Sequence, residues 1–426
     1  MRQISSLFAA VLTVGWFATP LAALAQADER VSTLAKAQKE PLLTTLKELV
    51  AIESGSADRE GLDAISALIA ERLKALGGQV EYIEPADVYR MQDTPAKLGR
   101  MVHARFIGKG SKRAMLIAHM DTVYPRGMAA AQPFRIENNR AYGLGIADDK
   151  QGIATILSVI EILRALKFDD YGLVTVLINA DEEISSPGSR STITKMGAEH
   201  DAVMSFEGSG SKNDGLSLTT AGIAGVSLTV RGRASHAGSA PERGLNALYE
   251  LAHQLLQTRD LSNPATGLKL NWTVAHAGNN RNVIPANADA MADVRVLKVA
   301  DYDGIEATLR ERIKTKLIAD TTVELIFERR RPPLEATGAS RKFAEHAQKI
   351  YAEIGKKLAI LDVAAGGGTD AAFASLKTTA PVVERFGLAG FGAHSNDAEY
   401  IEIESIVPRL YLAVRMVMEV AQGRGL

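Results

Sequence analysis

Histidine and acidic residues in this sequence stand directly after short apolar runs, where a metal or a catalytic group could be placed. His119 and Asp121 follow the run from 114 to 118. If the extended backbone continues, both side chains point to the same side, because side chains alternate along a strand. A carboxylate beside a histidine commonly orients the ring towards a metal. For this motif alone, a hydrogen-bonded surface histidine is the alternative.

A glycine-rich segment carries the next candidate, Asp148. The segment 143–150 begins like the G-x-G-x-x-G fingerprint, but Asp148 stands where the last glycine should be. Asp148 and Asp149 would repel a pyrophosphate, which excludes nucleotide binding. Asp148 could instead bridge two cations, with Asp149 in a structural role. As a plain alternative, Asp148 caps the following helix.

Acidic residues also follow two further apolar runs. The acids 181–183 come after the run 173–178, and Glu207 follows the run 202–206. Adjacent carboxylates at a strand end are costly unless they are solvated or bound to cations. The segment 181–183 is therefore either an acidic surface loop or a site in which one carboxylate ligates a metal and its neighbour stays free as a general base.

The joint placement of these candidates is more informative than any one of them. Ligands in open parallel sheets gather outside the carboxyl ends of the strands. His394, in the glycine-rich loop 387–394 after the predicted strand 381–385, would join them there. Because the chain has no cysteine, a metal must be held by His, Asp and Glu. The sequence therefore predicts a two-metal site at this sheet edge.

With these residues in view, the sequence resembles the M20 family of dinuclear zinc metallopeptidases, most closely its glutamate carboxypeptidase G2-like group. The motifs that carry the resemblance are spread over the mature chain, at 118–123, 145–150, 181–183, 205–207, 234–238, 282–286, 367–371 and 394–395. Together these motifs are specific, although each one alone is not.

The resemblance implies two Zn²⁺ per subunit. His119, Asp148 and Glu207 would hold one ion. Asp148, Glu183 and His394 would hold the other, so that Asp148 bridges the two. Imidazole and carboxylate ligands without sulfur suit zinc, and cobalt or manganese could substitute for it.

The resemblance also implies catalytic and substrate-binding roles. Glu182 would be the general base, and Asp121 would orient the histidine ligand at 119. His236 would reach the active site of a neighbouring subunit in a homodimer and stabilise the oxyanion there. Asn282 and Arg295 would bind the free carboxylate of the substrate, a task that suits the planar guanidinium of arginine.

Apolar patterning predicts the elements that position these residues. Helices are expected at 41–52, 60–76, 152–166 and 341–354 and from about 403, with strands at 80–83, 101–107, 114–118, 173–178, 202–206 and 381–385. This order predicts a doubly wound, mostly parallel α/β catalytic domain. Between them, strands at 225–230, 268–275, 288–296 and 323–327 and helices at 245–256 and 302–318 form a β-α-β-β-α-β series. That series is typical of a ferredoxin-like unit, here an inserted dimerisation or lid domain.

Length and charge limit the number of domains and the kinds of partner that the chain could have. The chain has 426 residues, enough for two or three domains of about 150 residues each. Its 49 Lys and Arg nearly balance its 50 Asp and Glu, so the chain has no excess of positive charge that would indicate binding to nucleic acid or anionic lipid. We expect a signal peptide at 1–27, a catalytic domain at 28–220 and 331–426, and the inserted domain at 221–330.

The first segment predicts export. Arg2, an apolar stretch at 7–24 and small residues at 23–27 are typical of a secretory signal peptide, with an uncleaved anchor as the alternative. No later apolar run approaches the length of about 20 residues that a membrane helix needs. The mature protein is therefore expected outside the membrane, in the periplasm if the source is a Gram-negative bacterium.

The predicted activity is hydrolysis of the amide bond to a C-terminal amino acid. Glutamate is the expected residue, in folate-type or N-acyl-glutamate substrates. The glutamate-directed pattern has a lysine directly before Leu216, where this chain has Gly215. Arg329 and Arg331 are candidate partners for an acidic side chain instead. The alternatives are an N-acyl-amino-acid deacylase, a dipeptidase of the same family, and an exported binding protein without hydrolytic activity.

Overall fold

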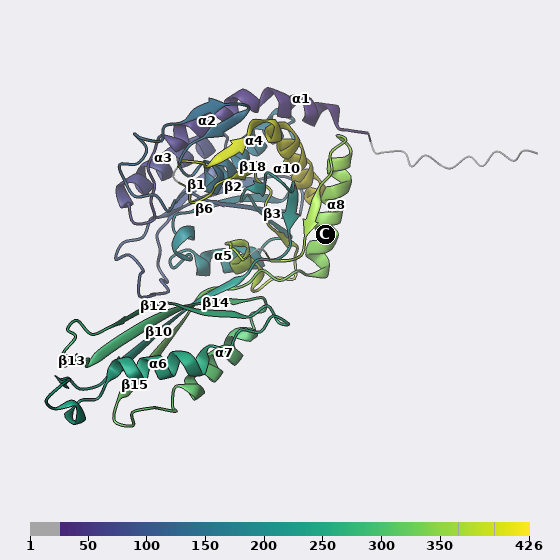
Figure 1. The fold of residues 1–426 in the computed structure, drawn as a ribbon. Coiled ribbons are helices and arrows are strands. Elements are labelled where there is room, and N and C mark those ends of the chain that lie inside the picture. Colours follow the sequence, from purple (N-terminus) through teal and green to yellow (C-terminus); the bar gives the residue numbers. More distant parts are fainter. Residues whose placement is uncertain (1–25, 365, 396) are drawn as a thin grey trace, which may run out of the picture.

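The computed structural model describes residues 26–364, 366–395 and 397–426, which form two domains (Figure 1). Apart from its last two residues, the predicted signal peptide lies outside the described part of the chain. Within that part, the structure contains no helix that is both long and apolar enough to span a membrane.

A six-stranded sheet forms the centre of the larger domain, in the order β1-β2-β6-β3-β7-β17. Its strands are β1 (Gln79–Ile83), β2 (Met101–Ile107), β3 (Arg113–His119), β6 (Leu173–Asn179), β7 (Ala202–Ser205) and β17 (Val382–Val383). Strand β3 runs parallel to both β6 and β7, and β7 runs parallel to β17. At one edge, β2 pairs in antiparallel fashion with both β1 and β6. The predicted α/β class is confirmed.

Helices cover both faces of this sheet, because β3 and its neighbours are apolar on both sides. Leu116 and Ala118 pack into the main core, whereas Met115 and Ile117 pack into a second apolar cluster. The main-core side carries α1 (Glu29–Ala37), α2 (Lys39–Val50), α3 (Arg59–Ala75), α4 (Gln151–Ala165) and α10 (Ile406–Ala421), with α8 (Gly338–Ala352) against α10. The other side carries α5 (Arg190–Ala198) and α9 (Ala371–Ser375).

Short strands that the sequence did not predict tie distant loops together. A five-stranded sheet has the order β4-β5-β19-β18-β8. Its strands are β4 (Arg135–Glu137), β5 (Arg140–Tyr142), β19 (Tyr400–Glu402), β18 (Ala389–Phe391) and β8 (Ser209–Gly210). A separate parallel pair is formed by β9 (Gly215–Ser217) and β16 (Ala359–Leu361), which are far apart in sequence. The five-stranded sheet brings the segment before Asp148 beside the segments that flank His394.

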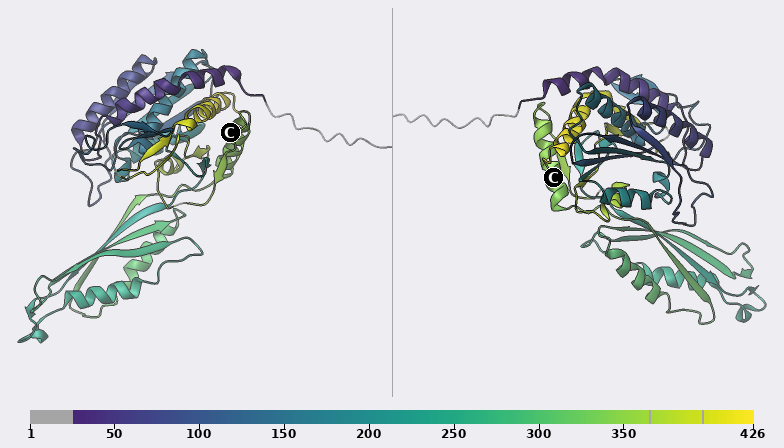
Figure 2. Two further views of the ribbon diagram at one scale, coloured as in Figure 1. Left: turned by 45° about the horizontal axis from the view of Figure 1, so that its top comes forward. Right: turned by 180° about the vertical axis from the view of Figure 1, so that it is seen from behind.

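The second domain is the predicted β-α-β-β-α-β unit. It consists of β10 (Gly222–Arg231), α6 (Ala247–Thr258), β12 (Lys269–Ala277), β14 (Asn287–Val296), α7 (Asp301–Arg312) and β15 (Thr322–Arg331). The antiparallel order β12-β14-β10-β15 is that of a ferredoxin-like sheet. Alternate residues of β10 are buried, and this face packs against the two helices. Figure 2 shows the domain projecting away from the larger one.

Helix α7 ends earlier than predicted, at Arg312 instead of Ile318. Carbonyls at and just after the helix end accept hydrogen bonds from side chains of α6 instead of from further turns of helix. Gln257 Nε2 donates to the carbonyl of Arg312 at 2.9 Å, and Gln254 Nε2 donates to the carbonyl of Thr315 at 3.0 Å. These tertiary hydrogen bonds satisfy the orphan groups of the helix end.

Candidate metal centre and its cavity

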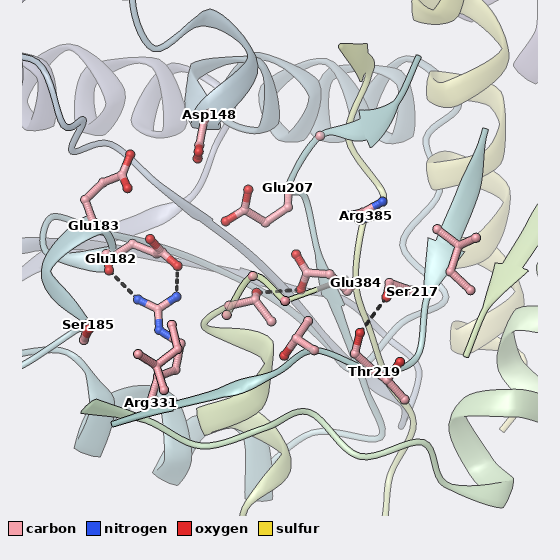
Figure 3. Close-up of a pocket in the computed structure, with 18 of the residues that line it drawn as sticks. Asp148, Glu182, Glu183, Ser185, Glu207, Ser217, Thr219, Arg331, Glu384 and Arg385 are labelled. Carbon is pink, nitrogen blue, oxygen red and sulfur yellow. Dashed lines mark hydrogen bonds and ion pairs between the residues drawn. The ribbon is translucent and has the colours of Figure 1, made fainter. Parts of the chain in front are cut away.

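The predicted metal ligands meet at the carboxyl-end edge of the central sheet. His119 ends β3, Glu183 follows β6 and Glu207 follows β7. Asp148 lies in the turn that leads into α4, and His394 lies in the loop before β19. Figure 3 shows Asp148, Glu183 and Glu207 pointing towards a common space. The topology thus gathers residues that are far apart in sequence.

The first group of potential ligands is His119, Asp148 and Glu207. One donor atom from each lies within 4.8 Å of the others. The Nε2 atom of His119 is 2.9 Å from Asp148 Oδ1 and 3.4 Å from Glu207 Oε1. The three atoms could therefore surround a single cation.

The second group is Asp148, Glu183 and His394, whose donor atoms also lie within 4.8 Å of one another. The Nε2 atom of His394 is 3.3 Å from Asp148 Oδ2 and 3.1 Å from Glu183 Oε2. Asp148 thus offers Oδ1 to the first group and Oδ2 to the second. A carboxylate placed in this way can bridge two cations. The peptide bond that joins Asp148 to Asp149 is cis.

The hydrogen bonds around these groups fit divalent cations. The Nδ1 atom of His119 lies 3.1 Å from the carbonyl oxygen of Asp121, which can only accept, so Nδ1 carries a proton. In the neutral ring, Nε2 then directs a lone pair at two carboxylates, and a cation between them would convert this repulsion into coordination. Glu183 Oε1 is buried and has no hydrogen-bond partner in the part of the chain that the structure describes. With imidazole and carboxylate donors only, the site suits zinc.

The crowded carboxylates shift the pKa values of the site. Burial raises the pKa of Glu183 to about 7, and the charge of Asp148 adds to the rise. Burial lowers the pKa of His119, but the carboxylates around it outweigh this and hold it well above its usual value. Hydrogen bonds to Asp148 and Glu183 raise the pKa of His394 to about 10. Protons on the histidines therefore offset part of the negative charge of the metal-free cluster, and a metal that displaces them would release protons.

Asp121 contacts one potential metal ligand and the backbone of the acidic pair. Its side chain is fully buried, and its Oδ1 lies 3.3 Å from Nδ1 of His119. The same carboxylate accepts the backbone N–H of Glu182 at 3.0 Å and that of Glu183 at 3.1 Å. The hydroxyl of Ser56 donates to it at 2.7 Å. Asp121 thus fixes the ring of one potential ligand and the backbone of the acidic pair.

Glu182 forms a buried ion pair with Arg331, the last residue of β15 (Figure 3). The guanidinium of Arg331 donates to the carboxylate of Glu182 and also to its backbone carbonyl. Glu182 itself belongs to neither of the two groups that could hold a metal. Its carboxylate therefore stays available beside the centre, held by a cation from the inserted domain.

A cavity of about 490 Å³ opens beside the centre. Its walls combine the acidic groups of the centre with three cations, Arg295, Arg331 and Arg385. Sequence reasoning missed Arg385, whose only signal was its place at the end of the predicted strand 381–385. Arg329, the other suggested partner for an acidic substrate side chain, is not among the described residues that line the cavity, and its guanidinium pairs with Asp303 at 2.6 Å and with Glu306 at 3.0 Å.

Arg295 is held in the cavity wall by neighbouring groups. Its Nε and Nη2 donate to the two carboxylate oxygens of Asp293, each at 2.9 Å. Its Nη1 donates to the carbonyl of Gly366 at 3.0 Å. This two-point contact fixes the plane of the guanidinium and leaves it bordering the cavity.

The structure does not bring His236 and Asn282 to the centre of their own chain. His236 lies on β11 (Ser235–His236), which pairs with β13 (Val283–Ile284) at the end of the inserted domain remote from the larger domain (Figure 1). Neither residue is among the described residues that line the cavity. The backbone segments that carry His236 and Asn282 lie side by side, since the backbone N–H of Ala237 donates to the carbonyl of Asn282 at 2.9 Å.

The exposed ring of His236 has a defined hydrogen-bonding state. Its Nδ1 accepts the backbone N–H groups of Gly238 and Ser239, both at 3.1 Å. An Nδ1 that accepts carries no proton, so the neutral ring holds its proton on Nε2. The side chain therefore presents one N–H donor at the surface of the inserted domain.

Comparisons with known proteins identify the family of the chain. The model of peptidase family M20/M25/M40 matches residues 115–419. Carboxypeptidase G2 from Pseudomonas sp. (strain RS-16) is 41% identical over 417 residues, which covers 98% of each chain. Acetylornithine deacetylase from Edwardsiella ictaluri is 27% identical over 88% of this chain and 97% of its own. The crystal structure of a tripeptidase from Staphylococcus aureus superposes with a TM-score of 0.73 at 20% identity, covering 90% of this chain and 99% of that one.

Proposed function

Since the chain belongs to peptidase family M20 and is a metallo-carboxypeptidase, we propose that it hydrolyses the amide bond to a C-terminal amino acid with two zinc ions per subunit. One observation carries this proposal. Two groups of ligands that share Asp148 border the same cavity as Arg295 and Arg331. The potential metal ligands and the arginines thus face one cavity, which could hold a water-activating centre beside a bound carboxylate.

The mechanism follows from what each side chain can do. Zinc ions held by the two groups would supply Lewis acidity and lower the pKa of a shared water molecule. Glu182 accepts a proton from the attacking water and returns it to the leaving amine. Arg295 holds the terminal carboxylate of the substrate, which fixes the scissile bond relative to Glu182. Asp121 keeps both the histidine ligand and the backbone of the acidic pair in place.

Glutamate is the proposed released residue. Gly215, in β9, supplies no cation where the glutamate-directed pattern has a lysine. Three arginines border the cavity, and one carboxylate of a glutamate would occupy Arg295. Arg385 remains to neutralise the second carboxylate, whereas Arg331 could do so only by leaving its ion pair with Glu182. Similarity to a protein named carboxypeptidase G2 supports this choice, and folate-type or N-acyl-glutamate compounds are the proposed substrates.

His236 and Asn282 are proposed to act in the active site of a partner subunit. Both are exposed and lie outside the cavity of their own chain. A surface N–H donor at the end of a projecting domain suits a role in trans, because a homodimer can carry that end to the partner's centre. There the Nε2–H of His236 would donate to the oxyanion that forms during attack.

Export is proposed on the strength of the first 27 residues alone. The expected signal peptide would direct the chain to the periplasm of a Gram-negative host. Amino-terminal sequencing of the protein from a periplasmic fraction should begin near residue 27. A mature protein that retained Met1 in the cytoplasmic fraction would contradict the proposal.

The test of the proposed activity combines metal removal with a substrate panel. Dialysis against a chelator should abolish turnover, and zinc should restore it, because the chain has no cysteine nucleophile. The panel should contain N-benzoyl and N-acetyl derivatives of glutamate and of leucine, together with unblocked dipeptides. We expect the highest kcat/KM for N-acyl-glutamate. Preference for dipeptides would favour a dipeptidase, and preference for short acyl groups regardless of the amino acid would favour a deacylase. Full activity of the metal-free protein would overturn the mechanism.

A further inference from the structure

Glu399 places a carboxylate inside the turn that carries Asp148. Glu399 directly precedes β19 and is only 3% exposed. Its Oε2 accepts the hydroxyl of Tyr124 at 2.6 Å and the backbone N–H of Gly145 at 2.9 Å. Its Oε1 accepts the backbone N–H groups of Ala147 at 2.8 Å and Asp148 at 3.1 Å. One carboxylate thus satisfies four donors.

The turn needs such an acceptor because its backbone is irregular. Gly145 lies in the left-handed region, with φ of 71°, and a Cβ there would come within 2.4 Å of Thr122 Cγ2. Asp148 also leaves the helical region, with φ of −136° and ψ of 89°. A backbone of this kind cannot pair its N–H groups by a repeating pattern, and buried N–H groups require acceptors. Glu399 provides acceptors for three of them, including that of Asp148 itself.

The same carboxylate is linked to the loop of His394. The hydroxyl of Tyr124, which donates to Glu399, also lies 3.1 Å from the carbonyl oxygen of Ser395. Ser395 is the neighbour of His394, and Glu399 ends the loop on the other side. Asp148 and His394 belong to the same potential metal-binding group. Both are therefore anchored at one buried anion that belongs to neither group.

We propose that Glu399 is a positioning residue of the metal centre, which fixes the bridging carboxylate of Asp148 and the loop of His394 before any ion binds. This proposal rests on the metal-binding part of the proposed function and not on its substrate. Outer partners of metal ligands typically change metal affinity or activity by about 10- to 100-fold when they are replaced.

The chemistry of the site demands a carboxylate and not merely a group of that shape. All four neighbours of Glu399 donate, and an ionised carboxylate only accepts. Glutamine has the same shape, but in either orientation its NH₂ group would face two donors. Because the Tyr124 hydroxyl can rotate and accept, Glu399→Gln loses at least one backbone hydrogen bond of the turn, and two where its NH₂ group faces Ala147 and Asp148, while it keeps the volume of the side chain.

The experiment measures zinc binding without substrate. Chelator-treated wild-type and Glu399→Gln proteins are titrated with zinc by calorimetry, and the visible spectra of the cobalt-loaded proteins are compared. We expect the affinity for the more weakly held ion to fall by about 10- to 100-fold, with a changed cobalt spectrum. Glu399→Asp, which restores the charge, should recover part of the affinity.

Glu419→Gln is the matched control. Glu419, on α10, is equally buried, with 3% exposure, and its carboxylate also accepts several donors, but it contacts no potential metal ligand. This control should lower the melting temperature of the metal-free protein and leave zinc affinity within about twofold of wild type. A merely structural Glu399 would behave in the same way as Glu419, with both ions bound at wild-type affinity, and that result would overturn the proposal.

Tyr124→Phe keeps the proposal testable if Glu399→Gln does not fold. It removes one donor to Glu399 and the link to Ser395 without changing the backbone. Affinity should fall by a smaller factor of about three, and unchanged affinity would remove the coupling to the His394 loop. If the wild type binds zinc but cleaves no N-acyl amino acid, the proposed substrate is wrong while the role of Glu399 stands.

Discussion

Glu182 and Arg331 form a buried ion pair that joins the centre of the larger domain to the last residue of the inserted sheet. Burial lowers the pKa of Arg331, while the surrounding carboxylates oppose that change. The hydroxyl of Tyr302 on α7 donates to the carbonyl of Arg331, which ties the same residue to the core of the inserted domain. The proposed base is therefore held by the segment at which the two domains meet.

The adjacent acids Glu182 and Glu183 should respond differently to the same substitution. Glu182→Gln should bind zinc as wild type does and lose about 10²- to 10⁴-fold in kcat, because an amide cannot accept the proton. Glu183→Gln should weaken zinc binding, since the Oε2 of Glu183 faces the same space as His394. Metal analysis after gel filtration, combined with kcat, checks both variants. The opposite pattern would mean that the two roles are exchanged.

Arg295 should act on substrate capture rather than on the chemical step. Arg295→Ala removes the guanidinium that borders the cavity and should weaken substrate binding by about 1.5 to 3 kcal/mol, the usual contribution of a hydrogen bond to a charged group. This appears as a raised KM with a smaller change in kcat. The matched test is a substrate whose terminal carboxylate is amidated. Wild type should cleave it poorly, and equal cleavage of amide and acid would remove Arg295 from this role.

Acid should weaken the carboxyl-terminal helix through Glu419. Burial raises the pKa of Glu419, but hydrogen bonds from Arg424, His346 and Arg415 outweigh it and lower the pKa to about 2 from 4.5. Because the pKa is lowered in the folded state, the stabilisation is complete above pH 4.5 and is lost as the pH falls from 4.5 towards 2. Its size is about 2 to 4 kcal/mol.

Thermal unfolding of wild type and Glu419→Gln over this pH range measures the effect. The difference in melting temperature should be largest above pH 5 and should shrink as the pH falls towards 3. Glu161→Gln, on the exposed face of α4, is the control and should give no such convergence. A difference that stays constant with pH would exclude the linkage.

The sequence predicted those parts of the fold that local pattern determines. Long apolar runs such as β3 and β6 are buried on both faces, so their composition alone indicates a parallel sheet between helices. The residue that follows each such run is placed at the sheet edge by topology. The clustering of His119, Glu183 and Glu207 could therefore be predicted from the sequence.

The parts of the fold and of the site that the sequence did not predict depend on contacts between distant segments, which leave no local sequence pattern. Strands β8, β18 and β19 have two or three residues each, too few for an alternation to be read. Glu399 looks like any exposed loop acid in the sequence, and its importance comes from a turn about 250 residues earlier in the chain. Arg385 borders the cavity only because β17 lies beside β7. Each of these is a tertiary effect.

The location of His236 gives the sharpest test of the proposed homodimer. Within one chain, β11 with His236 pairs with β13 at the end of the inserted domain that is remote from the larger domain, and the exposed ring accepts hydrogen bonds at Nδ1, which leaves its N–H on Nε2. If the histidine acts in trans, a homodimer in which both subunits carry His236→Ala should be nearly inactive. A homodimer in which both subunits carry Glu182→Gln should be nearly inactive as well. Both variants should still bind zinc, because neither residue belongs to a ligand group.

Mixing the two variants then separates the arrangements. In a mixed dimer, the subunit that carries His236→Ala keeps its own Glu182 and receives an intact His236 from the partner, so one of the two sites is complete. Random exchange makes half of the dimers mixed, and turnover should therefore recover to about a quarter of wild type. If His236 served its own chain, every site in the mixed dimer would lack one of the two groups. An inactive mixture, with subunit exchange verified by mass spectrometry, would therefore place the oxyanion donor elsewhere.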